Sequence, residues 1–389
     1  MDWQNTDGCQ MAKSSKSSAW PVYLKIVDLP PDIRDEHMIL AALYVRQEKP
    51  VMNAFMYPIV TEELNPLSEE GVEWINGKVK ILSKFVPLGF ILDLPARCSI
   101  CNMKQYNGKF GCTYCYHPSE SVNDNAKYPI SNKVHELRTH DKIVKDMIAA
   151  EKSNCEVRGV RGPSTLMLLK NLDLGNMIPP DSMHFLYLGI VPQHTDLLLT
   201  SHKEPYYIGS PNCQHIINNN LLSCKPPRRI TRSPRPITDR ANWKASEWRS
   251  WLLFYSLPCL QNVLPEKYWK HWAKLVAVAQ ILSSNSISKK DLEEANTLII
   301  EYTVEFQQIF GKQHMTYNLH LLLHVIRSVR MFGPIQGYDA FSFENENRLL
   351  LKLKTSPTQV TVKIAKRYMF YRSIPLFSTY FHKRLFTLS

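Results

Sequence analysis

Residues 85–118, FVPLGFILDLPARCSICNMKQYNGKFGCTYCYHP, decide the fold. Their first part is an apolar run that predicts a buried strand through Leu92, and Asp93 stands where this strand ends. An acidic side chain at a strand end points out of the core, and a carboxylate there suits a hard cation such as Mg²⁺. Asp93 is therefore a candidate ligand for a catalytic metal ion.

Two Cys-x-x-Cys pairs follow the strand, Cys98/Cys101 and Cys112/Cys115. Paired thiolates suit Zn²⁺ rather than Mg²⁺. The spacing of the four cysteines is typical of a zinc ribbon, which makes all four together one possible ligand set. The stretch thus predicts two metals with different roles, a catalytic ion at the carboxylate and a structural zinc at the thiolates.

Composition describes a folded protein with an anionic partner. The chain has 389 residues, of which 44% are hydrophobic and 21% are charged, enough for a large core in two or three structural parts. Lys and Arg number 47 against 35 Asp and Glu, so the net charge of +12 favours nucleic acid. The nine cysteines, the lack of a signal peptide and the lack of a bilayer-spanning run predict a reducing compartment and no membrane partner.

The elements before Asp93 predict a sheet that carries a second acid. Alternation predicts strands over 19–28 and 38–45, and apolar spacing predicts a broken helix over 52–70. If the residues before Asp7 end a first strand, Asp7 and Asp93 lie on adjacent strands, where two carboxylates can share divalent cations. The alternative is that Asp7 is a turn residue near a frayed terminus.

Asp181 and His184 form a second candidate constellation. They precede an apolar segment at the start of a predicted helix, so the carboxylate and the imidazole can face the same side. The alternative is a helix-capping Asp beside a partly buried His.

Residues 225–240, KPPRRITRSPRPITDR, predict an extended basic loop. Such a loop can hold a phosphate backbone, although a charge run is more often a solvated surface. The candidate DNA contacts are Arg228, Arg229, Arg232 and Arg235. Helical patterns follow over 243–264, 268–283 and 289–310, with their aromatic and Leu positions expected in a helix-bundle core.

His320 and His324 lie four residues apart in the helical pattern 317–331 and so share one face. Two imidazoles at this spacing are a common half of a zinc site, and with Cys112 and Cys115 they complete a Cys₂His₂ tetrahedron. The four-cysteine set remains the competing arrangement, and the histidines can also be core residues.

Gly333-Pro334 ends that helix, and Glu344 follows at the start of another helical pattern, 345–354. Large apolar residues flank this acid. Glu344 is either a further functional carboxylate or a residue paired with the helix dipole.

These residues together resemble the transposases of CACTA (En/Spm-type) DNA transposons, through nearly the whole chain. The shared motifs, in chain order, are Thr6-Asp7-Gly8, Ser17-Ser18-Ala19-Trp20-Pro21, Leu29-Pro30-Pro31, Asn107-Gly108-Lys109-Phe110-Gly111-Cys112-Thr113-Tyr114-Cys115, Asp181-Ser182-Met183-His184, Tyr317-Asn318-Leu319-His320, Gly333-Pro334 and Phe341-Ser342-Phe343-Glu344. So many short motifs in one order argue against coincidence.

The resemblance implies an α/β fold with a ribonuclease H-like mixed sheet, interrupted by a large, mainly helical insertion. It implies an acidic triad, which on this sequence is Asp7, Asp93 and Glu344, with two catalytic Mg²⁺ ions. It also favours a functional role for Asp181 and His184, as auxiliary residues near the site of DNA cleavage.

The arrangement further resembles the catalytic core of the vertebrate antigen-receptor recombinase. There a Cys-x-x-Cys after the second Asp and a His pair before the Glu hold one zinc. This resemblance favours Cys112, Cys115, His320 and His324 as the ligands of a structural zinc that links the sheet to the insertion. Cys98 and Cys101 are then ordinary thiols.

We therefore expect three segments. Residues 1–118 form the first part of the catalytic core, residues 119–310 form the helical insertion, and residues 311–389 return with the His pair and Glu344. The resemblance implies DNA cleavage and strand transfer at transposon ends in the nucleus, with DNA and a second copy of the chain as partners.

Alternatives to an active transposase remain open. Because only six residues precede Asp7, we expect a short first strand and either a fragment of a longer transposase or a host-recruited derivative. Such a derivative would bind DNA or assemble with other proteins without cutting. An unrelated zinc-ribbon interaction protein would instead place Cys98 and Cys101 on the metal.

Overall fold

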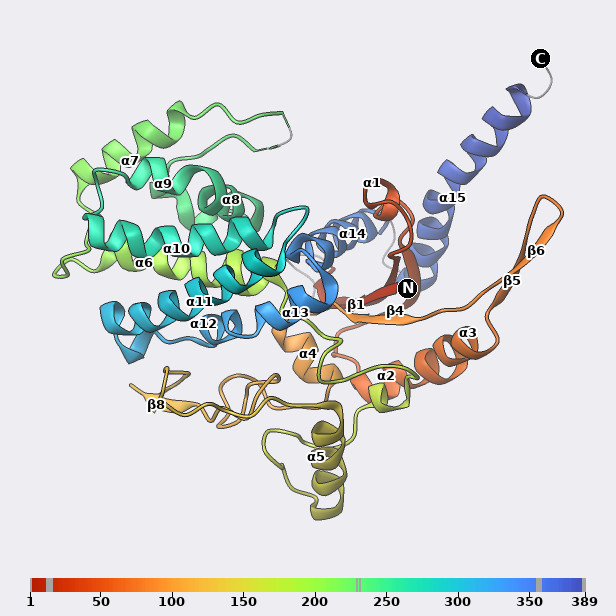
Figure 1. Cartoon of the computed structure of the whole chain (residues 1–389). Helices are drawn as coiled ribbons and strands as arrows, with labels where there is room; N and C mark the ends of the chain where they lie inside the picture. Colours follow the sequence, from red (N-terminus) through yellow and green to blue (C-terminus); the bar gives the residue numbers. More distant parts are fainter. Residues whose placement is uncertain (1, 12–16, 229, 231, 355–358, 387–389) are drawn as a thin grey trace. The chain divides into compact units, whose positions relative to one another are not determined.

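The computed structural model describes residues 2–11, 17–228, 230, 232–354 and 359–386 (Figure 1). The chain forms two compact units, each built from separate segments. The first comprises Met1–Gln105, Arg138–Pro179 and Ala340–Ser389, and the second comprises Tyr106–Leu137 and Pro180–Asp339. These boundaries differ from those expected from the sequence, because residues 106–118 and 311–339 belong with the helical part and residues 138–179 with the sheet.

The first unit contains a five-stranded mixed sheet, in agreement with the expected α/β class. Its strands are β1 (Asp2–Thr6), β2 (Cys9–Gln10), β3 (Ser18–Ile26), β4 (Ile39–Arg46) and β7 (Pro87–Phe90). Strand β3 pairs antiparallel with β1, β2 and β4, whereas β7 pairs parallel with β1. The strands predicted over 19–28 and 38–45 are confirmed, and the one before Asp93 ends two residues earlier than expected.

Strand β1 lies between β3 and β7, which makes it a central strand. All five of its residues, DWQNT, are buried although four of them are polar. The Asn5 side-chain amide donates to Ile91 O at 2.7 Å, and the Ile91 N–H donates to Gln4 O at 2.8 Å. These bonds fix the end of β7 beside the end of β1, so Asp7 and Asp93 follow neighbouring parallel strands.

Helices cover the sheet of the first unit. The broken helix expected over 52–70 consists of α2 (Met52–Pro58), a π-helical turn η1 (Ile59–Leu64) and α3 (Asn65–Glu69). Further helices are α1 (Pro31–Arg34), α4 (Leu94–Ile100), α5 (His140–Ser153), η2 (Thr165–Leu168), α14 (Phe341–Lys352) and α15 (Val360–Phe386). Val22, Phe90 and Leu92 pack with Met56, Val60 and Met147 in one core cluster.

A hairpin of β5 (Val72–Asn76) and β6 (Val79–Ser83) leaves this unit as a long ribbon (Figure 1). The turn between the strands contains Gly77 at φ +65°, a backbone conformation that glycine adopts without strain. The sequence analysis assigned no element to these residues.

The second unit is mainly helical. Its elements after the strand pair β8 (Glu120–Val122) and β9 (Asn125–Lys127) are η3 (Met183–Ile190), α6 (Val191–Thr200), α7 (Pro211–Ser223), η4 (Ile237–Asn242), α8 (Ala245–Ser250), η5 (Trp251–Tyr255), α9 (Ser256–Leu260), α10 (Glu266–Leu282), α11 (Lys289–Phe310), η6 (Lys312–His314), α12 (Tyr317–Leu322), α13 (Val325–Phe332) and η7 (Ile335–Tyr338). Trp248, Trp251 and Trp272 are buried, which confirms them as core residues. None of the helices in the described part of the chain is both long and apolar enough to cross a bilayer.

Candidate metal centre and acidic site

The thiols of Cys112 and Cys115 come from a loop that the segment 106–137 holds in place. The Tyr116 N–H donates to Glu136 O at 2.9 Å, and the Tyr128 hydroxyl donates to Tyr106 O at 2.6 Å. Inside the loop, the Tyr114 N–H donates to the Cys112 Sγ atom at 3.4 Å. A backbone donor aimed at sulfur favours the thiolate, which is the form that binds a metal.

The two imidazoles of the centre come from His320 in α12 and His324 directly before α13. The expectation of one continuous helix over 317–331 is wrong, because the chain forms a turn at residues 323 and 324. The Nε2 atoms of the two rings nevertheless lie 3.2 Å apart. The expectation that the pair shares one face is therefore confirmed.

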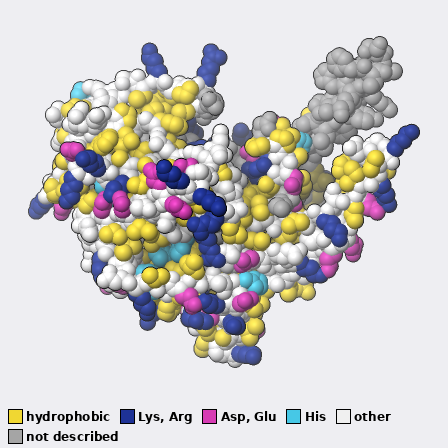
Figure 2. Space-filling model, viewed as in Figure 1, with side chains coloured by type: hydrophobic (Ala, Val, Ile, Leu, Met, Phe, Trp, Pro, Cys, Tyr) yellow, Lys and Arg dark blue, Asp and Glu magenta, His cyan; other side chains and the backbone are white. Residues whose placement is uncertain are grey.

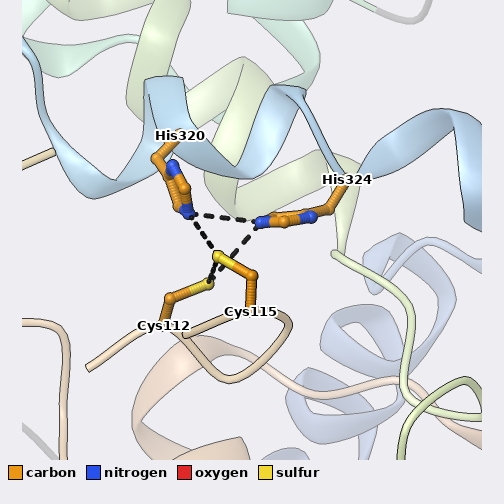
Figure 3. Close-up of side chains that lie close together, drawn as sticks. All are labelled: Cys112, Cys115, His320 and His324. Carbon is orange, nitrogen blue, oxygen red and sulfur yellow. Dashed lines mark hydrogen bonds between the residues drawn. The ribbon is translucent and has the colours of Figure 1, made fainter. Parts of the chain in front are cut away.

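The two halves meet in a buried Cys₂His₂ cluster (Figure 3). The two Sγ atoms are 3.6 Å apart, Cys115 Sγ is 3.3 Å from His320 Nε2, and Cys112 Sγ is 3.6 Å from His324 Nε2. A tetrahedral zinc with the usual bond lengths separates two sulfurs by about 3.8 Å and two nitrogens by about 3.4 Å. The cluster has these spacings within a few tenths of an ångström, so it is able to bind zinc.

The electrostatics of the cluster favour the metal-binding forms of its residues. Burial acts to raise the pKa of Cys112, but the hydrogen bond from Cys115 and the charges of His320 and His324 hold this pKa well below its usual value. Burial also lowers the pKa of His320, against the attraction of Cys112. A thiolate beside neutral imidazoles is the state that zinc requires.

Aromatic rings enclose the cluster. Tyr114 stacks on His324 with ring centroids 5.2 Å apart, and Tyr128 stacks on His320 at 5.1 Å. These rings orient the imidazoles and limit the access of water, both of which strengthen metal binding.

The other cysteine pair lies in the first unit, at the end of α4. The Cys98 thiol donates to Lys104 O at 3.4 Å. Burial raises the pKa of Cys98 to about 12 and that of Cys101 to about 11, so both sulfurs keep their protons at neutral pH. Within the described chain the Cys₂His₂ set is the one group of three or more such side chains at metal-ligand spacing, and the four-cysteine arrangement is not formed.

All four cluster residues belong to the second unit. The expectation that zinc joins the sheet to the helical insertion is therefore not confirmed. The cluster instead connects two segments of one unit, the loop within 106–137 and the end of α12 with the turn that follows it.

Asp7 and Asp93 stand beyond the carboxyl ends of the parallel strands β1 and β7. Asp93 is the N-cap of α4, where its carboxylate accepts a hydrogen bond from the Ala96 N–H at 2.7 Å. The Asp7 carboxylate accepts from the Gly8 N–H at 2.6 Å. The predicted placement of the two acids on adjacent strands is confirmed, and each uses a carboxylate oxygen to accept a backbone hydrogen bond.

Glu344 lies in the first turn of α14, in the same unit. A residue that the sequence analysis did not single out, Cys9, connects it to Asp7. Burial, followed by the charges of Asp7 and Glu344, raises the pKa of Cys9 to about 12. Both carboxylates thus lie within electrostatic range of the Cys9 thiol.

The Thr6-Asp7-Gly8 and Trp20-Pro21 motifs face each other across the β1–β3 ladder, since Thr6 pairs with Val22 and Cys9 with Ala19. A Cβ atom at Gly8 would lie 2.5 Å from the Trp20 ring. Gly8 is thus required for the indole to cover the backbone beside Asp7.

The Asp181 carboxylate accepts hydrogen bonds from the N–H groups of Met183 and His184 and contacts the His184 Nδ1 atom at 2.5 Å. Asp181 is buried, whereas the His184 side chain is about a third exposed. Asp181 therefore caps the helix, as the second alternative drawn from the sequence expects, and it also orients the imidazole of His184. Farther along η3, Gly189 lies against Asn318, which brings this motif next to the helix of His320.

The arginines of the basic loop lie in different environments. Arg235 is bound to Glu247 and Asp239 at 2.7 and 2.5 Å, which identifies it as a structural residue of the loop. Arg232 reaches Glu247 only at 4.0 Å, Arg228 is exposed, and Arg229 lies outside the described residues. The loop is extended only in part, because residues 237–242 form η4. On the face shown in Figure 2, Lys and Arg are spread over much of the surface with Asp and Glu between them.

Comparison with known proteins identifies one family model. The model of a domain of unknown function, DUF4218, matches residues 282–387, which include His320, His324 and Glu344. No curated protein matches the chain. The matched range covers about a quarter of the sequence and carries the imidazole half of the metal cluster.

Proposed function

We propose that this protein is a CACTA-type transposase or a close derivative, which cuts DNA at a carboxylate site on a ribonuclease H-like sheet. The observation that carries the proposal is the position of Asp7 and Asp93 after the neighbouring parallel strands β1 and β7. The charges of both Asp7 and Glu344 act on Cys9, and this supports Glu344 as the third member of the triad.

The carboxylates suit hard cations and fit a site of two ions better than a site of one. Two catalytic ions stand about 3.5 to 4 Å apart, so their ligands spread more widely than the ligands of a single ion. With two Mg²⁺ ions bound, the site would activate water or a DNA 3′-hydroxyl for in-line attack on a phosphodiester.

The residues of the chain have separate tasks in this proposal. Asp93 is held rigidly by α4, which keeps one carboxylate oxygen in a fixed place at the end of β7. The Cys₂His₂ cluster has a structural role, since all four ligand positions of a tetrahedral zinc are filled by protein. Asp181 and His184 present an oriented imidazole that suits contact with DNA, and exposed basic residues such as Arg228 bind the phosphate backbone in the nucleus.

A second candidate is a non-catalytic DNA-binding derivative of such a transposase. Asp7 and Asp93 both accept backbone hydrogen bonds, and these bonds would hold the loops equally well in a protein without metal ions. This derivative would keep the fold and the zinc while the acids had only a structural role.

Replacement of Asp93 by Asn distinguishes the two candidates. Asp93→Asn keeps the shape of the side chain but removes the charge that holds a cation, so nicking of DNA with transposon ends in Mg²⁺ should fall by at least about a hundredfold. DNA affinity should stay equal or rise slightly at low salt, because binding depends on Lys and Arg.

Asp173→Asn is the control, since Asp173 lies in the same unit outside the triad. If wild type and Asp93→Asn both bind and neither cuts with Mg²⁺ or Mn²⁺, the non-catalytic derivative is the better account. If Asp93→Asn cuts as well as wild type, the triad is wrong.

A further inference from the structure

An open cavity of about 650 Å³ lies in the second unit, between the first half of the basic loop and the helical segment 246–255. It has the volume of a small-ligand site. The cavity is distinct from the metal cluster and from the three acids, and it uses a part of the loop that Arg235 does not occupy.

The charged side chains of this cavity all have one sign. Lys225, Arg232 and Arg249 line it, and none of the described residues in its wall is acidic. Arg232 is poorly neutralised, because its guanidinium is 4.0 Å from the nearest Glu247 oxygen. The wall is therefore suited to an anionic group such as a phosphate.

The cavity also presents an aromatic face and a hydroxyl that lacks a partner. Phe254, on the π-helical turn η5, lines the cavity although 56% of its surface is exposed. Beside it the Tyr255 hydroxyl is buried with no hydrogen-bond partner. This hydroxyl has almost no accessible surface, so the exposed Phe254 ring is the face of the cavity on which a planar group can stack.

We propose that this cavity binds one unpaired nucleotide of DNA. The base stacks on Phe254, while Lys225, Arg232 and Arg249 contact the flanking phosphates. A base inside a duplex is already stacked and paired, so only a single-stranded or extruded nucleotide fits. The inference rests on the proposed function for the choice of DNA as the polymer, but not for cleavage.

Three DNAs of equal length test the proposal by fluorescence anisotropy with the full chain at one fixed salt concentration and without divalent cations. The first is a duplex, the second has a short unpaired stretch, and the third has the same stretch with abasic sites. Wild type should bind the second DNA roughly tenfold more tightly than the other two, since aromatic stacking on one base contributes about that much.

Phe254→Ala should lose this preference and keep its affinity for the duplex. Ile300→Ala, another exposed apolar residue of the same unit, should behave as wild type. Arg232→Ala should weaken binding of the unpaired DNA more than Lys267→Ala, which removes the same charge from α10. A thermal unfolding midpoint equal to that of wild type shows that each variant is folded.

The proposal is overturned if Phe254→Ala keeps the preference, or if the abasic DNA binds as tightly as the DNA with unpaired bases. Equal binding of the abasic DNA would mean that the cavity binds phosphate groups and makes no contact with a base. Failure of wild type to nick DNA would count against the proposed catalysis and leave these binding results standing.

Discussion

The two Cys-x-x-Cys pairs of this chain have the same spacing and opposite chemistry. Cys98 and Cys101 end a helix in the first unit, where burial raises their pKa values to about 12 and 11. Cys112 and Cys115 occupy a loop in the second unit, where the hydrogen bond from Cys115 and the two imidazoles hold the pKa of Cys112 well below its usual value despite burial. Both pairs are buried, so burial does not make the difference.

The comparison teaches that the neighbours of a cysteine pair, rather than its spacing, decide whether it binds a metal. At the first pair the charge of Arg97 does not offset the effect of burial, whereas the second pair meets His320 and His324 from far along the sequence. A thiol without a positive or metal partner keeps its proton, and it then behaves as a small apolar residue.

The largest expected effect is on the folding of the second unit. His320→Ala removes one zinc ligand and leaves thiolates buried without a metal, so the free energy of unfolding should fall by several kcal/mol. Chemical unfolding followed by tryptophan fluorescence measures this, because the core of the unit contains Trp248, Trp251 and Trp272. Cys98→Ala is the control and should cost only about 1 kcal/mol. Equal losses in both variants would remove the distinction between the pairs.

His271 is a buried imidazole outside the metal cluster, and it tests separately how burial changes a pKa. The His271 Nδ1–H donates to the Glu305 carboxylate at 3.1 Å, and the ring stacks on Tyr302. Burial lowers the pKa of His271 to about 4 despite Glu305. The unfolded chain binds a proton near pH 6.5 and the folded chain does not, so stability is lost as the pH falls from 6.5 to 4. The pKa difference corresponds to a loss on the order of 3 kcal/mol.

His271→Phe should remove this part of the acid sensitivity, because Phe has no proton to gain. The free energies of unfolding of wild type and His271→Phe are measured at pH 7, 5.5 and 4.5. Because the zinc ligands titrate in both proteins, their contribution cancels in the difference between the two. Parallel pH profiles would show that His271 is not buried in its neutral form.

The smallest expected effect is on the alkylation of the cysteine thiols, which changes without loss of the fold. At pH 8 Cys98 and Cys101 should resist alkylation because they keep their protons, with or without a chelator. Cys112 and Cys115 should be protected by zinc and become labelled after chelation. Mass spectrometry of the labelled peptides measures this, and labelling of Cys98 ahead of Cys112 after chelation would contradict the assignment.

The sequence predicted the elements whose pattern is local. Helix α11 covers residues 289–310 as expected and begins after the Ser288 cap, whose side chain accepts from the Asp291 N–H. The Cys₂His₂ set was one of two ligand sets that the spacings allowed, and the resemblance favoured it over the four-cysteine set.

Other features depend on tertiary contacts that no local pattern reports. Strand β1 reads as polar, yet its residues are buried because they lie between two strands. The segment around His324 contains no Gly or Pro, so the sequence predicts a continuous helix there. The structure instead has a turn at residues 323 and 324. The hairpin β5–β6 is different, since its Asn76-Gly77 turn is a recognisable signal between two alternating segments.

Zinc content tests the central assignment most directly. The purified full chain, the Cys112→Ser variant and the Cys98→Ser variant are each dialysed against a metal-free buffer and measured by elemental mass spectrometry. We expect about one zinc per chain in wild type and Cys98→Ser and little in Cys112→Ser, because the latter lacks one of four ligands. Full zinc in Cys112→Ser together with loss of zinc in Cys98→Ser would contradict the assignment and place the metal on the first pair.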